Sequence, residues 1–221
     1  KIVAGVGTND TRHSIELTEQ VNSIGADGVL LVTPYYSKPA AEGVLAHFQT
    51  IAAVSEAPVM LYDVPGRTGL RIPFEVYQRA AELDNVIAVK EAVGDLTQGF
   101  RLIHELGYSV YSGDDGNNLA WLAMGAAGVV SVAGHVVGDQ LKEMVTAVER
   151  GDLSAARDSF AEQLPAIEAI MGVSNYGATT AKAALELIGV LDNRRVRLPQ
   201  IELTAAEVDH LREGLRAARV L

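Results

Sequence analysis

The chain of 221 residues is long enough for one substantial core, and its 48% hydrophobic and 21% charged residues are an ordinary balance for a globular protein. A formal net charge of −10, without any basic–aromatic stripe, argues against nucleic-acid or anionic-membrane partners, which the long-range field would repel. The absence of cysteine excludes disulfides and thiolate chemistry, and no apolar run approaches the roughly 20 residues that span a bilayer, so we expect a cytoplasmic protein.

Six short runs rich in Val, Ile and Leu are typical of parallel strands that are covered on both faces. They occupy residues 2–6, 28–33, 58–64, 86–90, 109–112 and 128–132. Amphipathic stretches between them predict helices over residues 11–24, 40–55, 73–83, 96–106 and 116–124. The centres of successive runs lie 19 to 31 residues apart, a spacing that suits βα units and is too long for hairpins.

After residue 132 the pattern becomes purely helical. Helices are predicted over residues 136–150, 153–171, 176–188 and 205–218. We therefore expect a barrel portion at 1–133, followed by the last barrel helix and a C-terminal helical region at 134–221.

Two α/β architectures suit repeated parallel units: an open doubly wound sheet and a (β/α)8 TIM barrel. A dinucleotide-binding sheet needs a third glycine after its first strand, and Asp10 stands at that position. Polar and reactive residues follow several of the runs, as expected at the C-terminal face of a barrel. A barrel needs eight strands, so we expect the six runs to be strands 3–8, with the first two βα units absent.

Lys90 is the most informative candidate, because it ends an apolar strand and shares a face with Ala88. Partial burial would lower the pKa of its amine and enable attack on a carbonyl to form an imine. A structural lysine that reaches water at a strand end is the alternative. Tyr62 ends the preceding run, so it is expected beside Lys90, where its phenol could move protons. Arg67 follows on a predicted loop, where it could bind a substrate carboxylate or simply lie at the surface.

Metal chemistry is not expected, because the five histidines are scattered and none are paired at ligand spacing. Asp114 and Asp115 follow a predicted strand and precede a predicted helix. We interpret both as turn and N-cap residues rather than metal ligands.

Four blocks of sequence together resemble the dihydrodipicolinate synthase (4-hydroxy-tetrahydrodipicolinate synthase) family, and their order and spacing match over essentially the whole chain. The blocks are TPYY at 33–36, LYDVPGRTG at 61–69, VKEA at 89–92 and SGDD at 112–115. The resemblance implies a Schiff-base lyase that condenses pyruvate with L-aspartate 4-semialdehyde in lysine and diaminopimelate biosynthesis. It also implies that no cofactor is needed beyond the covalent imine of pyruvate with Lys90.

The family's site residues map onto this chain one by one. Lys90 would be the Schiff-base lysine, Tyr62 a proton relay, and Tyr36 a relay residue that a neighbouring subunit supplies, in a dimer or a homotetramer built as a dimer of dimers. Arg67 would orient the semialdehyde carboxylate. Gly113 and Val130 would line the pyruvate pocket through backbone groups.

The sequence also departs from the family pattern. Asp63 stands where many members have Asn, and His13 stands where members inhibited by lysine carry an acidic residue. Two rival functions remain open: a sister pyruvate-dependent aldolase, such as N-acetylneuraminate lyase or a keto-deoxy-sugar-acid aldolase, and an inactive truncated barrel fragment. Arg67 favours the synthase, since the sister enzymes would not need it.

Overall fold

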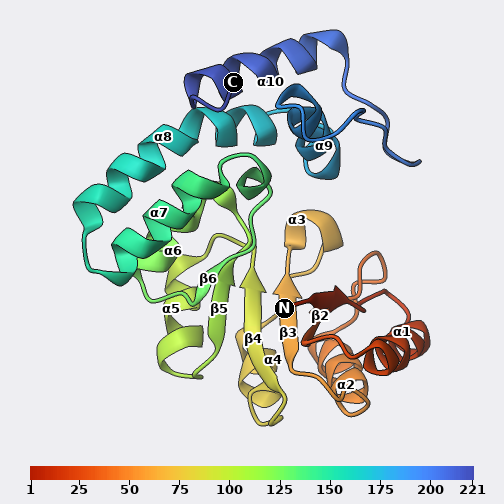
Figure 1. The fold of residues 1–221 in the computed structure, drawn as a ribbon. Helices are drawn as coiled ribbons and strands as arrows, with labels where there is room; N and C mark the ends of the chain where they lie inside the picture. The colour runs from red at the N-terminus through yellow and green to blue at the C-terminus, as the bar shows by residue number, and fades with distance from the viewer. The chain divides into compact units, whose positions relative to one another are not determined.

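A computed structural model describes residues 1–221 and contains one six-stranded parallel sheet with the strand order β1-β2-β3-β4-β5-β6 (Figure 1). The strands are β1 (Val3–Gly5), β2 (Gly28–Val32), β3 (Val59–Asp63), β4 (Val86–Glu91), β5 (Ser109–Ser112) and β6 (Gly128–Val129). Consecutive strands are neighbours, and each pairing from β1 to β5 is parallel. All six predicted strands are therefore confirmed, with β6 shorter than expected.

Helices alternate with the strands as predicted. They are α1 (Thr11–Ile24), α2 (Ala41–Ala52), α4 (Phe74–Ala80), α5 (Leu96–His104) and α6 (Asn118–Ala123). Asp10 caps α1 by accepting a hydrogen bond from the backbone N–H of His13, and Gly25 ends the helix in a left-handed conformation. An additional short helix, α3 (Pro65–Thr68), occupies the segment that was predicted to be a loop. Pro65 suits its first turn and Gly69 closes it, so the loop prediction was wrong.

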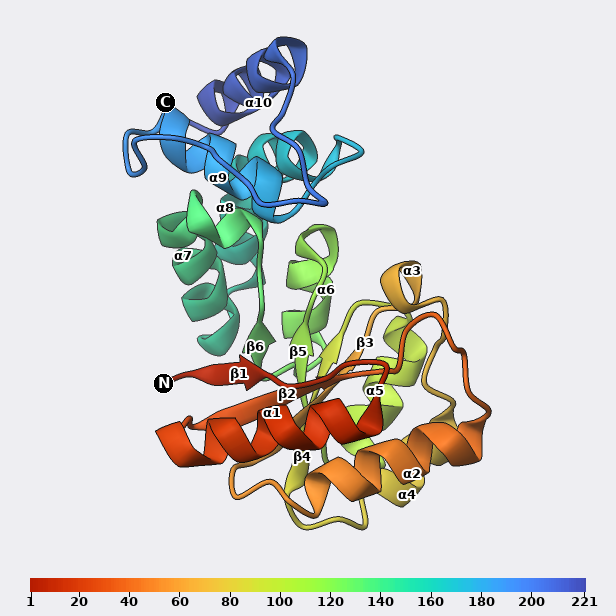
Figure 2. The same ribbon diagram turned by 90° about the vertical axis from the view of Figure 1, so that its right-hand side faces the viewer.

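The alternation of side chains along the strands gives the sheet two different faces. On one face, Leu31, Leu61, Val89 and Val110 are fully buried. The helices pack against this face, and α1 and α2 lie side by side (Figure 2). On the other face, which we call the open face, several side chains are only partly buried; among them are Val32, Tyr62, Lys90 and Tyr111. These four occupy one layer, because the register pairs each with the next.

The chain forms two compact units. The first comprises residues 1–113 and 124–128, and the second comprises residues 114–123 and 129–221. The second unit holds α6, two short 3-10 helices, η1 (Asp115–Asn117) and η2 (Ala133–His135), and the helices α7 (Gly138–Glu149), α8 (Leu153–Met171), α9 (Ala178–Leu187) and α10 (Ala205–Ala217). The four helices predicted after residue 132 are thus confirmed. The proposed division at residue 133 stays a prediction.

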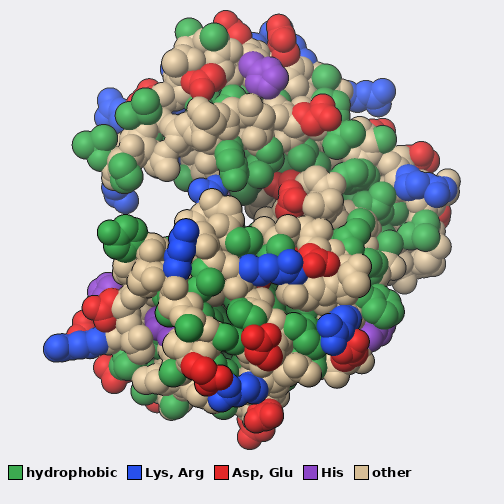
Figure 3. Space-filling model, turned by 180° about the vertical axis from the view of Figure 1, so that it is seen from behind, with side chains coloured by type: hydrophobic (Ala, Val, Ile, Leu, Met, Phe, Trp, Pro, Cys, Tyr) green, Lys and Arg blue, Asp and Glu red, His purple; other side chains and the backbone are tan.

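The second unit has its own apolar core, in which α8 contacts both α7 and α10. Ile170 and Leu211 are fully buried at the α8–α10 contact, and Met144 is fully buried on α7. Thr204 begins α10 with a capping box that it forms with Glu207. None of the helices is long and apolar enough to cross a membrane. Lysine and arginine side chains on the face drawn in Figure 3 are dispersed among acidic ones.

Differences in burial along the sheet predict different costs of truncation. Leu61→Ala removes a fully buried side chain from the helix-covered face and should lower the free energy of unfolding by about 2–5 kcal/mol. Ile87→Ala, on a side chain that is 48% exposed, should cost less than about 1 kcal/mol. Urea unfolding of the two variants measures both values, and equal losses would contradict the burial of Leu61.

Candidate active site

The centre of the candidate site is the contact between Lys90 and Tyr62. Tyr62 on β3 pairs directly with Lys90 on β4, so both side chains leave the sheet on the open face at the same level. The Lys90 Nζ atom lies 4.2 Å from the centroid of the Tyr62 ring. This distance is within cation–π range, so the amine and the aromatic ring are in direct contact. The predicted adjacency of the two residues is confirmed, while their catalytic roles stay predictions.

A cavity of about 340 Å³ opens on the same face of the sheet, at the carboxyl ends of β1 to β3. Its lining includes Gly7, Tyr35, Tyr62 and Arg67. Arg67 lies on α3, which begins directly after β3, and its backbone N–H donates to the carbonyl of Val64. The short helix therefore places Arg67 at the cavity that Tyr62 also lines.

Gly113 lies where a side chain would crowd both the backbone of Glu91 and the side chain of Lys90. Its backbone N–H donates to the carbonyl of Glu91 at 2.6 Å. A Cβ atom at this position would lie 2.9 Å from that carbonyl oxygen and 3.1 Å from Lys90 Cε. The absence of a side chain thus lets the backbone after β5 approach the stem of Lys90. The structure brings Lys90, Tyr62 and Gly113 together in the first unit.

Tyr36 does not line this cavity; its neighbour Tyr35 does. The Tyr36 side chain is 87% exposed, and its backbone φ is +70°, in the left-handed region that bulky residues rarely adopt. An exposed aromatic ring on a strained backbone is unusual for a residue that serves only the fold. Its outward position is compatible with a role at another subunit.

Val130 belongs to the second unit and follows β6 directly. The segment after it is held by Asp115, which is 3% exposed. One oxygen of Asp115 accepts hydrogen bonds from the backbone N–H groups of Val132 and Ala133 at 3.0 and 2.8 Å, and the other accepts from the Ser131 hydroxyl. Asp115 is therefore an anchor for residues 131–133.

That anchor corrects one of the predicted turn assignments. Asp114 caps η1 as expected, since its side chain accepts from the backbone N–H of Gly116. Asp115 was expected to act in the same local way, but its carboxylate bonds residues 16 to 18 positions further along the chain. Sequence spacing gives no sign of such a distant partner.

Sequence reasoning also missed two buried carboxyl groups behind the Tyr62–Lys90 pair. Asp63 and Glu91 each follow one of those residues, and they pair with each other across β3 and β4. They point to the opposite, helix-covered face and are 0% and 1% exposed. Strand alternation applied to these two positions would have revealed them.

The two carboxyl groups are held differently. Glu91 accepts backbone hydrogen bonds from Val93 and Gly94 at 2.9 to 3.2 Å. The Oδ2 atom of Asp63 accepts from the backbone of Ile72 at 3.1 Å and from the Tyr77 hydroxyl at 3.0 Å, whereas its buried Oδ1 atom has no hydrogen-bond partner.

Burial dominates the ionisation of both groups. It raises the pKa of Asp63 to about 7, against the opposing hydrogen bonds from Ile72 and Tyr77 and with a smaller contribution from the negative charge of Glu91. Burial also raises the pKa of Glu91, although the backbone donors at Gly94 and Val93 favour its charged form.

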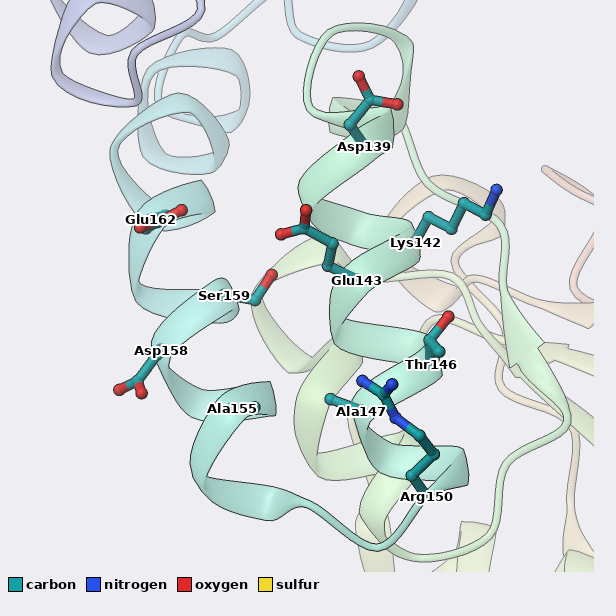
Figure 4. A pocket seen from close by; sticks show the side chains of 10 residues that line it. All are labelled: Asp139, Lys142, Glu143, Thr146, Ala147, Arg150, Ala155, Asp158, Ser159 and Glu162. Atoms are coloured by element: carbon teal, nitrogen blue, oxygen red, sulfur yellow. The ribbon is translucent and has the colours of Figure 1, made fainter.

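A larger depression of about 810 Å³ lies between α7 and α8 and contains none of the predicted site residues (Figure 4). Charged side chains of both signs line it, among them Lys142, Glu143, Arg150 and Asp158. No group of three or more histidine, aspartate or glutamate side chains is placed to hold a metal ion.

The raised pKa of Asp63 predicts how stability changes with pH. The folded state keeps the Asp63 proton up to about pH 7, whereas the unfolded chain loses it near pH 4, so ionisation costs stability as the pH rises between these values. Asp63→Asn cannot ionise. It should therefore reduce the loss of unfolding free energy between pH 5 and pH 8 by on the order of 2 kcal/mol.

Urea unfolding at the two pH values measures this difference. Asp84→Asn, at an exposed position, is the matched control and should follow the unmodified chain. Parallel pH curves for all three proteins would contradict a titration of Asp63.

Comparison with known proteins identifies the family. Residues 1–218 match the dihydrodipicolinate synthetase family. The 4-hydroxy-tetrahydrodipicolinate synthase of Bifidobacterium longum is 42% identical over 220 residues, covering 100% of this chain and 73% of that protein. The corresponding protein of Corynebacterium aurimucosum is 46% identical over 222 residues, covering 100% and 72%.

A solved structure gives the same result for the fold. The chloride-inhibited dihydrodipicolinate synthase of Acinetobacter baumannii, complexed with pyruvate, superimposes with a TM-score of 0.93 at 36% identity. The match covers 100% of this chain and 75% of that structure. Because the family match spans residues 1–218 and the relatives are more than 40% identical over the whole chain, the chain belongs to the dihydrodipicolinate synthetase family.

Proposed function

We propose that this protein is a class I lyase that condenses pyruvate with L-aspartate 4-semialdehyde to give 4-hydroxy-tetrahydrodipicolinate, in lysine and diaminopimelate biosynthesis. The observation that carries the proposal is the contact between Lys90 Nζ and the Tyr62 ring, at 4.2 Å, in a chain of this family. The names of the relatives from Bifidobacterium longum and Corynebacterium aurimucosum support the same reaction.

Lys90 would begin the reaction as a nucleophile. Its neutral amine attacks C2 of pyruvate, and the resulting carbinolamine loses water to give an imine. Tyr62 lies beside the amine and would carry protons to and from the oxygen that leaves. Loss of a proton from C3 then gives an enamine, for which the iminium nitrogen is the electron sink. No further cofactor is required in this scheme.

The enamine would next attack the aldehyde carbon of the second substrate. The free amine of that substrate then attacks C2, closes the ring and releases Lys90. Arg67 would bind the carboxylate of the semialdehyde through its guanidinium group, because Arg67 lines the same cavity as Tyr62. Gly113 and Val130 would line the pyruvate position through backbone groups, and the close approach of Gly113 to Lys90 supports its part.

The oligomer is also part of this proposal. Tyr36 would enter the site of a neighbouring subunit and complete the proton relay, in a dimer or in a homotetramer made from two such dimers. Its exposed ring and its absence from the cavity of its own chain support this assignment. In the same scheme the six strands correspond to strands 3–8 of the family's barrel, the last helices form its C-terminal extension, and the protein acts in the cytoplasm.

Two rivals make different predictions. A sister pyruvate-dependent aldolase would share Lys90 and Tyr62 and would cleave sugar acids without using the semialdehyde. An inactive fragment would form no imine. Arg67 at the cavity favours the synthase, because the second substrate carries a carboxylate that a guanidinium can hold through two hydrogen bonds.

Borohydride trapping tests the nucleophile. Reduction of the protein with pyruvate present should add one reduced pyruvate group to the peptide that contains Lys90, as read by peptide mass spectrometry. Lys90→Arg keeps the charge and should abolish the adduct. An adduct on another lysine, or none on the unmodified chain, would falsify the proposal.

Arg67→Ala tests the second substrate. The loss of a bidentate carboxylate contact should raise KM for the semialdehyde by roughly 10- to 100-fold, since such contacts contribute about 1.5–3 kcal/mol. Trapping of pyruvate on Lys90 should change less than about threefold. Equal losses in both measurements would show that Arg67 serves the fold or the first substrate instead.

A further inference from the structure

The two buried carboxyl groups behind the active-site strands have no part in the reaction described above. Asp63 and Glu91 lie next to each other across β3 and β4, directly after Tyr62 and Lys90. Both are almost completely excluded from solvent. Two negative charges so close together in a poorly solvated environment are unfavourable, so such a pair tends to hold one proton.

Hydrogen bonding indicates which group carries that proton. Glu91 receives two backbone N–H donors, which stabilise a carboxylate. Asp63 receives one backbone N–H and one phenol, both on Oδ2, and its Oδ1 atom is without a partner. An unsolvated carboxylate oxygen without a donor is costly, whereas a neutral carboxylic acid tolerates this position better. The geometry therefore favours a neutral Asp63 beside an ionised Glu91.

The remaining charged groups near Asp63 do not cancel a second negative charge. The cation that acts on Asp63 is Arg71, and its guanidinium is already bonded to Asp95 at 2.6 Å. On α4, Tyr77 faces Asp63 and carries no charge, and Tyr108, before β5, donates its hydroxyl to the carbonyl of Tyr77. The next cation on the neighbouring strand is Lys90, one residue before Glu91 and on the opposite face.

We propose that Asp63 is a positioning residue for Lys90. While Asp63 is neutral, Glu91 is the single negative charge behind the reactive strands. Ionisation of Asp63 adds a second charge, which stabilises the ammonium form of Lys90 and slows imine formation. This inference rests on the proposed role of Lys90. Electrostatics through a poorly solvated sheet is the physical link, because the field of a buried charge is weakly screened. The proton that Asp63 loses goes to solvent, and no other chemical step changes.

The proton itself can be observed without any enzymatic activity. Isotope-edited infrared spectroscopy of protein labelled with ¹³C-aspartate should show a protonated carboxyl band that disappears near neutral pH. Asp63→Asn should remove this band, whereas Asp84→Asn should leave it. Tyr77→Phe removes a donor that favours the ionised form, so it should move the titration to higher pH. A band that is absent throughout, or one that persists in Asp63→Asn, would overturn the proposal.

The effect on Lys90 is measured by the rate of borohydride trapping of pyruvate as a function of pH. With Asp63→Asn the profile should move to lower pH by about half a unit to one unit, which makes trapping at pH 8 roughly threefold to tenfold faster. Asp84→Asn should match the unmodified chain. Superimposed profiles would overturn the coupling between Asp63 and Lys90. An absence of trapping in every protein would instead contradict the proposed function, and the infrared experiment would then test the protonation of Asp63 by itself.

Discussion

The parallel register between β3 and β4 is the constraint on which the rest of the site depends. It sets Tyr62 opposite Lys90 and, one residue later, Asp63 opposite Glu91. Because successive side chains point to opposite faces, the same register creates a reactive pair on the open face and a carboxyl pair on the other. A shift of β4 by one residue against β3 would break both pairs, placing Glu91 on the open face and Lys90 beneath the helices. Burial of Leu61 and Val89 on the helix-covered face opposes that shift.

Buried carboxylates have a second structural use in this protein. Asp115 accepts hydrogen bonds from consecutive backbone N–H groups after β6 and from the Ser131 hydroxyl. These donors lie at the start of η2, where the helix itself offers them no acceptor. In each unit, therefore, an acidic side chain next to a strand end holds loop backbone in place: Glu91 in the first and Asp115 in the second. These positions are sensitive to charge and geometry rather than to hydrophobicity alone.

Much of the fold followed from the sequence, because strands that are covered on both faces leave nearly continuous apolar runs and helices leave a 3.6-residue period. The adjacency of Tyr62 and Lys90 followed from strand order alone. The short helix α3 did not, since four residues around Pro65 and Gly66 are too few for a periodic signal. The long-range bonds of Asp115 were also out of reach, because they depend on tertiary contacts that no local pattern encodes. Strand alternation could have predicted that Asp63 and Glu91 face the buried side of the sheet. The prediction was missed because the runs that contain or precede them are otherwise apolar.

The backbone of Tyr36 has a consequence for how this surface can vary. A left-handed conformation costs an L-residue about 1 kcal/mol or more, and glycine would adopt it without that penalty. The tyrosine ring contributes little burial within its own chain, so it does not offset this cost internally. An isolated chain would thus become more stable on replacement by glycine. In the proposed dimer, contacts with the neighbouring subunit would offset this cost, so the stability of the chain and its association would be linked at Tyr36.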